Sequence, residues 1–491
     1  MLIEREQAES DLLACAAFVA ERIGSADGHA ASVSDIALRY AARGELDLAA
    51  GMADEIKDPH TRDIVLSEVA ARCADFDDDE YGLQLTEAIE EYGYQQQAKH
   101  NLAARQAVNG RLEAALATVK QIDDPFAAVG EIAVRFAHDG DETRSRELLE
   151  QIDFPTVRVQ VLNELAAAKI KRGALLEDVL AESLREAEQI EFAEERTQLL
   201  LEIAARFHEA GQDDKTIAVL EQAKQLAETL ERRFRDSVLV QIALLYARLG
   251  DFDTAEQTLK PIEDLQQTAH AHAGIALEHR SNGDDENALG SLAETYAVLK
   301  SQPEKLIRDS AARFNLFATV AIRFADFGKP ERGLEIALEN PDDEARYTAL
   351  NNIAAIAAAN NREDIARQAA NSIEDFAGRV FALVAISRAE TNDAEKSLQY
   401  LHEAAGLSEE IERLSLRAQA LNEIAERYAE LGDKAKASAL LHQSLQTAQS
   451  IVDQSLQSAA LVNLSEVYEK LDLELSEKDF EILSLIVRKR I

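Results

Sequence analysis

The chain has 491 residues, and its 91 acidic and 52 basic side chains give a formal net charge of −39 at pH 7. This charge argues against binding to nucleic acid or to an anionic membrane, because both would be repelled. With 20 glycines, 7 prolines and no tryptophan, and with a predominance of helix-forming residues, the composition predicts an all-α protein.

Residues 1–30 are expected to form an N-terminal capping helix. Acidic residues precede its apolar stretch and no cleavage site follows, which differs from a secretory signal and favours a cytoplasmic protein. Cys15 and Cys73 are the only cysteines, and each is flanked by apolar, helix-type sequence. They predict neither a disulfide framework nor a metal-binding pair, in agreement with a reducing compartment.

From Ser34 onward the sequence repeats a pattern in which Ile-Ala is followed by an aromatic residue and then by a turn residue. The turn residues are Gly44, Asp77, Gly110, Gly140, Gly173, Gly211, Gly250, Gly283, Gly328, Asn361, Asn392, Gly432 and Asp472. Gly, Asn and Asp tolerate the left-handed backbone that ends a helix. The pattern therefore predicts about thirteen antiparallel helix pairs over residues 31–472.

The repeats have two lengths, about 31 to 33 residues and about 38 to 45 residues. We expect the longer repeats to extend their second helix, whereas Pro59, Pro125 and Pro155 end the second helix of short repeats. The long spacing after Gly283 contains Pro303, so a hinge is expected near residues 301–313.

The repeat resembles the tetratricopeptide repeat (TPR). In the copy around Gly432, the matching residues are Leu421, Ile424, Ala425, Tyr428, Gly432, Ala437 and Leu441. The family's tryptophan is absent and its proline is shifted or lost, so the chain is described as TPR-like. The resemblance implies a right-handed superhelical solenoid, with residues 473–491 as a C-terminal capping helix.

The resemblance also implies that peptides bind on the concave surface formed by the first helices. The corresponding positions hold Leu38 and Ala41, Ala71 and Ala74, Ala104 and Ala107, Ala205 and His208, and Ala355 and Ala358. They are mostly small and apolar. No repeat carries the Lys and Asn set with which chaperone-binding TPR proteins clamp a terminal carboxylate, so binding of an acidic tail is not expected.

An unbalanced acidic segment between residues 73 and 98 holds eight acidic residues and neither Lys nor Arg. Its candidate partner-binding residues are Asp75, Asp77, Asp78, Asp79, Glu80 and Tyr81. The first interpretation is a solvated acidic face, and the alternative is a docking site for a basic peptide, which charge complementarity would favour. A calcium loop is disfavoured, because Glu80 and Thr86 replace its essential Gly and Glu.

Arginine recurs five residues before many of the turns. It stands at Arg39, Arg72, Arg105, Arg135, Arg206, Arg323 and Arg427, often with an acidic residue four positions earlier. This spacing favours a structural ladder of ion pairs. The alternative is an arginine-lined track for acidic ligands, which the negative charge of the chain disfavours.

His270, His272 and His279 form the one cluster that suggests a metal. His272 aligns with Leu or Val of other repeats and His279 with Tyr or Phe, so both are expected in the core. Two histidines seven residues apart supply only two ligands, fewer than a zinc site needs. We therefore expect no metal and no cofactor.

No catalytic motif stands out, and the sequence predicts a protein that is not an enzyme. The favoured function is a protein–protein interaction scaffold whose partner is apolar or basic rather than acidic. Two alternatives are a regulatory or sensor solenoid that binds a small ligand or modified peptide, and a non-catalytic subunit of an enzyme complex.

Overall fold

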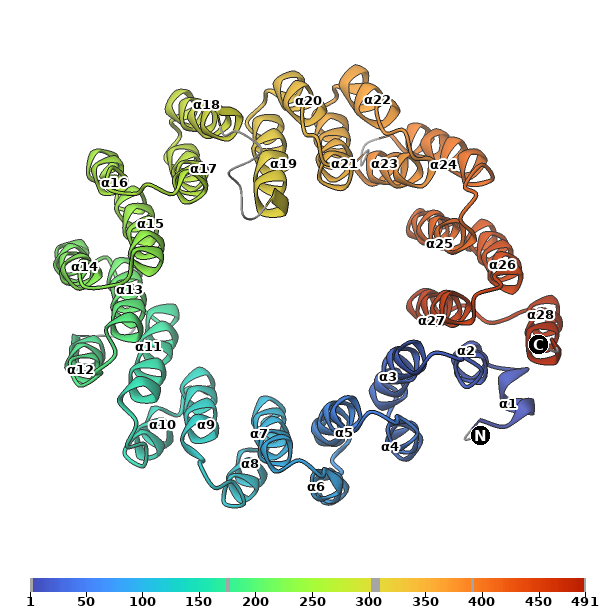
Figure 1. The fold of residues 1–491 in the computed structure, drawn as a ribbon, viewed down its shortest axis with the longest axis horizontal. Helices are drawn as coiled ribbons and strands as arrows, with labels where there is room; N and C mark the ends of the chain where they lie inside the picture. Colours follow the sequence, from blue (N-terminus) through green and yellow to red (C-terminus); the bar gives the residue numbers. More distant parts are fainter. Residues whose placement is uncertain (1–2, 174–176, 302–309, 390–392, 490–491) are drawn as a thin grey trace. The chain divides into compact units, whose positions relative to one another are not determined.

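The computed structural model describes residues 3–173, 177–301, 310–389 and 393–489 (Figure 1). Within these ranges the chain forms 28 α-helices, one short 3₁₀ helix, η1 (Ala74–Phe76), and no strand, which confirms the all-α prediction. Two units have their own internal contacts. Unit 1 comprises Met1–Val69 and Phe314–Ile491, and unit 2 comprises Ala70–Arg313.

In unit 2, long first helices alternate with second helices. The first helices are α7 (Tyr92–Val108), α9 (Phe126–Asp139), α11 (Pro155–Lys171), α13 (Ala193–Glu209), α15 (Arg232–Arg248) and α17 (Leu265–Ser281). The second helices are α6 (Asp79–Ala88), α8 (Leu112–Val119), α10 (Glu142–Leu149), α12 (Glu177–Ala187), α14 (Asp213–Ala227), α16 (Phe252–Leu259) and α18 (Asp285–Ser301). Successive first helices pack side by side, and Figure 1 shows them along the inner side of this unit.

Unit 1 contains helices from both ends of the chain. They are α1 (Arg5–Ala8), α2 (Leu12–Ala20), α3 (Ala26–Ala42), α4 (Leu46–Asp54), α20 (Pro330–Leu338), α21 (Asp343–Ala359), α22 (Glu363–Asn371), α23 (Phe376–Ala389), α24 (Ala394–Ser408), α25 (Leu414–Glu430), α26 (Lys434–Ser450), α27 (Gln454–Leu471) and α28 (Glu477–Arg488). The divisions between the units fall within α5 (Pro59–Cys73) and α19 (Ser310–Asp326).

The turns between paired helices follow the sequence prediction. Every predicted turn residue within the described ranges has a positive φ. Asn392 lies outside these ranges. The following residue then donates its N–H to the carbonyl at the aromatic position of the repeat, as from Glu45 to Tyr40 and from Asp433 to Tyr428. This bond satisfies a carbonyl that the helix end would leave unpaired.

The second helices differ in length largely as predicted, although α12 of the long repeat after Gly173 has only 11 residues. In short repeats they have 8 to 10 residues, as in α8 and α6. In the long repeats α14 and α24 have 15 residues, and α18 and α26 have 17. Most of the predicted hinge, including Pro303, lies outside the described residues.

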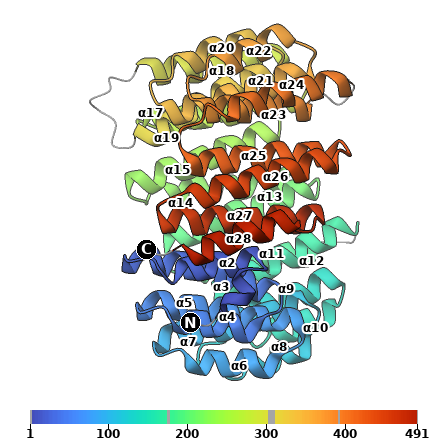
Figure 2. The same ribbon diagram turned by 90° about the vertical axis from the view of Figure 1, so that its right-hand side faces the viewer.

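Helices from the two ends of the chain pack together within unit 1. All nine residues of α2 are buried, and α2 lies against α27 and α28 (Figure 2). The Ser458 hydroxyl donates to the carbonyl of Ala16 at 3.0 Å, and the Arg22 guanidinium donates to the carbonyl of Val487 at 2.9 Å. The capping role predicted for the terminal segments stays a prediction, but residues 3–25 hold two helices, not one, and α3 already begins at Ala26.

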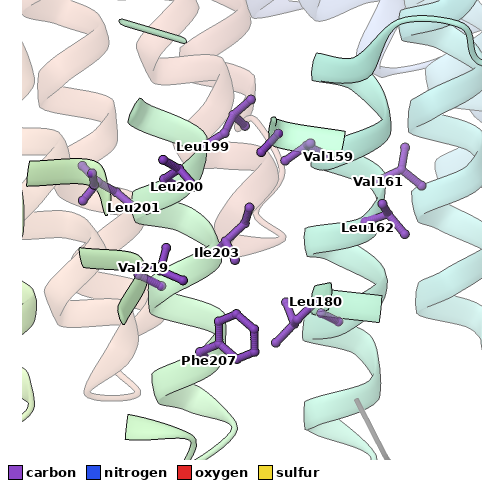
Figure 3. Close-up of a cluster of buried hydrophobic side chains, with 14 of the residues drawn as sticks. Val159, Val161, Leu162, Leu180, Leu199, Leu200, Leu201, Ile203, Phe207 and Val219 are labelled. Atoms are coloured by element: carbon purple, nitrogen blue, oxygen red, sulfur yellow. The ribbon is translucent and has the colours of Figure 1, made fainter. Parts of the chain in front are cut away.

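The core of unit 2 runs along the contacts between successive helix pairs. Figure 3 shows it between α11 and α13, where Val159 and Leu162 face Leu199, Ile203 and their neighbours. Because each helix pair buries its apolar side only against the next pair, stability is shared along the row.

Candidate peptide-binding groove

Three successive first helices of unit 2 line an open cavity of 440 Å³, here named the α7–α11 groove. Its lining residues are Ala104, Ala107 and Val108 of α7, Ala127, Gly130, Glu131, Val134, Arg135 and His138 of α9, and Val157, Gln160, Val161 and Glu164 of α11. The floor is therefore made of small and β-branched apolar residues. The volume is within the range of about 300 to 1,000 Å³ that is typical of ligand sites.

Helical periodicity places these residues on one face. On α11, Val157, Gln160, Val161 and Glu164 follow the three- and four-residue spacing that aligns side chains along a helix. The exposed end of the floor is Val108, which is 61% exposed. Apolar surface of this kind gains free energy when a ligand removes it from water.

Gly130 allows two of the helices that line the groove to lie close together. A Cβ atom built on Gly130 would lie 2.7 Å from Cγ1 of Val157, so α9 and α11 approach more closely than a larger residue would allow. Gly130 is buried beneath the floor. The small residue thus brings two first helices together where the groove passes between them.

The charged residues at the rim are already paired. His100 bonds to Glu131 at 2.9 Å, and His138 lies 3.4 Å from Glu164, which also pairs with Arg206 at 3.1 Å. The hydrogen bond to Glu131 raises the pKa of His100, against the opposing effect of burial. Arg135 pairs with Asp139 at 3.1 Å.

Apart from Ala74, which lies in η1, the inner positions expected from the resemblance lie on first helices, and Ala104 and Ala107 line the groove. Ala104, Leu38, Ala205 and Ala355 are half-buried, whereas Ala107, Ala41 and Ala358 are buried. Some of these small apolar residues therefore form an accessible floor, and others lie in the contact between helices.

The acidic segment makes contacts with the next helix pair. Arg105 binds Asp75 at 2.6 Å and holds the pKa of that carboxyl below its usual value. Arg111 lies 2.9 Å from Asp79 and 3.3 Å from Asp77. Two basic residues that follow the segment in sequence thus offset part of its charge.

The remaining candidate residues of the acidic segment differ in their contacts and in their exposure. The Asp78 side chain accepts from the backbone N–H of Tyr81 and caps α6. Glu80 is exposed and Tyr81 is half-buried. None of the six candidates lines the α7–α11 groove, and their binding of a basic partner stays a prediction.

The recurring arginines contact preceding helices more often than the acid predicted within their own helix. Arg39 does pair with Asp35, at 3.3 Å. In contrast, Arg206 reaches Glu164 of α11, and Arg427 donates to the carbonyl of Ser387 of α23 at 2.7 Å. The guanidinium extends across the helix contact because carbonyl and carboxylate acceptors of the previous repeat lie within its reach.

Three partners predicted from the four-residue spacing are wrong in detail, since Arg206 pairs with Glu164 and Glu209 and not with Glu202. Arg135 pairs with Asp139 and not with Glu131, which bonds to His100 instead. Arg427 pairs with Glu430 at 3.1 Å. Arg72 and Arg323 are half-buried at the same repeat position.

The predicted core positions of His272 and His279 are confirmed, and both cysteines are buried as well. His272 and His279 are buried, and His279 stacks on Phe252 with ring centroids 3.7 Å apart. His270 is exposed. Cys15 and Cys73 are free and buried, and burial raises the pKa of Cys15 to about 12.

Sequence reasoning identified Ala104 and Ala107 of the groove but missed Val134, Val157 and Val161. Val134 stands at the aligned position of its own repeat, six residues before Gly140, whereas Val157 and Val161 lie more than one turn before the aligned position on α11. A search for small or β-branched residues at three- and four-residue spacing on every first helix would have found them.

Comparisons with known proteins give distant likenesses to solved structures. No family model matches the sequence, and no curated protein matches it. Ton1535 from Thermococcus onnurineus NA1 is 16% identical over 68% of this chain and 98% of that protein, with a TM-score of 0.32. The signal transduction ATPase PH0952 from Pyrococcus horikoshii, which has a tetratricopeptide repeat sensor, is 15% identical over 81% of this chain and 64% of that chain, with a TM-score of 0.26.

Yeast Tom70 is 13% identical over 91% of this chain and 97% of that chain, with a TM-score of 0.21. Among the described residues, no helix combines the length and apolar character needed to cross a bilayer. The classification rests on the chain itself, on its paired helices, its left-handed Gly, Asn and Asp turns and its stacked first helices. This chain is an α-helical repeat protein whose repeat resembles the tetratricopeptide repeat.

Proposed function

We propose that this protein is a non-catalytic interaction scaffold that holds an apolar segment of another protein in the α7–α11 groove. The observation that carries the proposal is an open apolar floor beside rim charges that already pair with neighbouring side chains. A ligand can cover the floor without separating these ion pairs, so the apolar area it buries contributes directly to binding.

The expected ligand is apolar with neutral or basic flanks. The net charge of −39 repels acidic segments over long distances, and Glu131 and Glu164 lie at the rim. A cytoplasmic location is part of the proposal and agrees with two free cysteines.

The test is a selection of peptides on the full chain from a random library, followed by affinity measurements on the selected peptides. We expect apolar peptides with an excess of Lys and Arg over Asp and Glu. The double variant Val108→Lys/Ala127→Lys should weaken their binding at least tenfold, because it places two cations on exposed positions of the apolar floor.

A matched control carries the same chemical change outside the groove. Ile217 and Ala117 are also exposed but lie on the second helices α14 and α8, so Ile217→Lys/Ala117→Lys should bind the selected peptides as the unmodified chain does. Equal binding by both double variants would place the peptide site elsewhere. Selection of acidic peptides would contradict the proposed ligand chemistry.

A further inference from the structure

Three side chains with metal-ligand atoms converge between two neighbouring helix pairs of unit 2, away from the groove. They are Glu256 of α16, His272 of α17 and Glu294 of α18, and one ligand atom from each lies within 4.8 Å of the others. Nδ1 of His272 is 3.3 Å from Oε1 of Glu256 and 3.7 Å from Oε2 of Glu294.

The buried imidazole nitrogen at the centre of this group has no well-aligned hydrogen bond, and its nearest acceptor is the Glu256 carboxylate at 3.3 Å. His272 is only 8% exposed, and its Nδ1 is buried and faces the two carboxylates. A buried polar atom without a hydrogen bond destabilises a fold unless another interaction compensates. Its orientation toward two acids therefore needs an explanation beyond packing.

The two carboxylates have no basic partner other than this histidine. In the part of the chain that the structure describes, neither Glu256 nor Glu294 forms an ion pair with Lys or Arg. Their side chains are 44% and 66% exposed, so water and ions can reach the group from outside. Two like charges held close together repel each other, and a cation between them would remove this repulsion.

The separations suit a four-coordinate metal ion. Bonds of about 2.0 to 2.1 Å at tetrahedral angles place neighbouring ligand atoms about 3.3 to 3.4 Å apart. The two distances from His272 Nδ1, 3.3 and 3.7 Å, are close to this spacing. Three protein ligands would leave the fourth position to water.

We infer that Glu256, His272 and Glu294 bind a divalent transition-metal ion of the zinc class. One imidazole and two carboxylates suit Zn²⁺, whereas Mg²⁺ and Ca²⁺ prefer oxygen ligands alone. The ion joins the α15–α16 pair to the α17–α18 pair, because its ligands come from both. It acts as a cross-link between neighbouring repeats.

The experiment uses the full chain, freed of metal with a chelator and titrated with Co²⁺. A Co²⁺ ion bound by His and Glu side chains at low coordination number absorbs visible light much more strongly than the hydrated ion. This distinguishes the site from loose association with an acidic surface. We expect saturation at one Co²⁺ per chain, displacement by Zn²⁺, retention in excess Mg²⁺, and a higher unfolding temperature with Zn²⁺.

Two conservative variants on α18 are compared for their affinity for Co²⁺. Glu294→Gln removes a ligand at an exposed position and should weaken Co²⁺ binding at least tenfold. Glu286→Gln removes one negative charge from an exposed position of the same helix and should leave the affinity unchanged. The absence of a visible spectrum, or equal affinities of the two variants, would overturn the site and leave a protonated His272 between two carboxylates as the explanation.

Discussion

At the scale of single residues, Asp479 connects two helices near the C-terminal end of unit 1. It is only 2% exposed, accepts hydrogen bonds from the backbone and hydroxyl of Ser476 at the start of α28, and bonds to His442 of α26 at 2.6 Å. Burial alone raises the pKa of Asp479, but the bonds from Ser476 and His442 outweigh it and the pKa is lowered.

A lowered folded-state pKa makes the contribution of Asp479 depend on pH in a defined direction. It stabilises the fold fully above the unfolded value of about 3.9 and is lost as pH falls through the folded-state pKa. We expect Asp479→Asn to lower the free energy of unfolding at pH 7 by about 1.5 to 3 kcal/mol. Urea unfolding at neutral and acidic pH measures this difference, which should shrink in acid. A constant difference would contradict the role of the charge.

Residue identity predicted burial better than it predicted partners. The positions of His272 and His279 in the repeat indicated a buried site, since the equivalent residues elsewhere are apolar. The partners came from other helices: Glu256 and Glu294 for His272, and Ser387 for Arg427. Periodicity identifies the face of a helix that is buried, but it does not identify which side chain of the next helix meets it.

At the scale of helices, small residues determine how closely neighbours approach. A Cβ on Gly333 of α20 would lie 2.5 Å from the carbonyl oxygen of Ala321 on α19. Because that oxygen belongs to a helix backbone, it cannot rotate away as a side chain would. The glycine is therefore required by the packing of α19 and α20.

Gly333→Ala should consequently destabilise the protein by about 1 to 3 kcal/mol, the usual effect of overpacking. Gly290 of α18 is the control, because a Cβ there has no neighbour within 4 Å. Gly290→Ala should stabilise by about 0.5 to 1 kcal/mol through helix propensity alone. Thermal unfolding of both variants measures the contrast, and a neutral Gly333→Ala would show that α19 and α20 separate at little cost.

Helix boundaries were largely readable from the sequence. The turn residues Gly, Asn and Asp predicted where first helices end, and repeat spacing predicted which second helices are long. Both signals are local, since they depend on backbone conformation and on the number of residues between turns. The α7–α11 groove was only partly predicted, because its floor combines residues of three helices whose separation depends on Gly130.

At the scale of the whole chain, α2 packs against its neighbours α1 and α3 but also against helices from the far end of the sequence. Its nine residues are all buried, yet it packs against α27 and α28. Nothing near α2 in sequence indicates this contact, and the sequence therefore suggested only a cap over residues 1–30. Contacts between segments so far apart leave no trace in periodicity or spacing.

A chain that begins at Ser25 would expose the side of α27 that α2 covers. We expect its unfolding temperature to fall by about 5 °C or more and the chain to self-associate, as exposed apolar surfaces do. Calorimetry and light scattering measure both effects. A synthetic peptide of residues 4–24 should restore stability when added separately.

The same peptide with Ala16→Asp should not restore it, because Ala16 is fully buried and its carbonyl accepts from Ser458. Restoration by both peptides, or by neither, would show that α2 does not act through this contact.

The packing of α2 also has a consequence for how the protein is made. Ala16 and Ser458 are 442 residues apart, and ribosomes add about 5 to 20 residues per second, so about 20 to 90 seconds separate the synthesis of the two. During this interval α2 can pack against α1 and α3, but the side that α27 and α28 cover has no native partner. We expect this exposed apolar side to make the nascent chain dependent on chaperones that bind short apolar segments, and slower translation to lengthen that dependence.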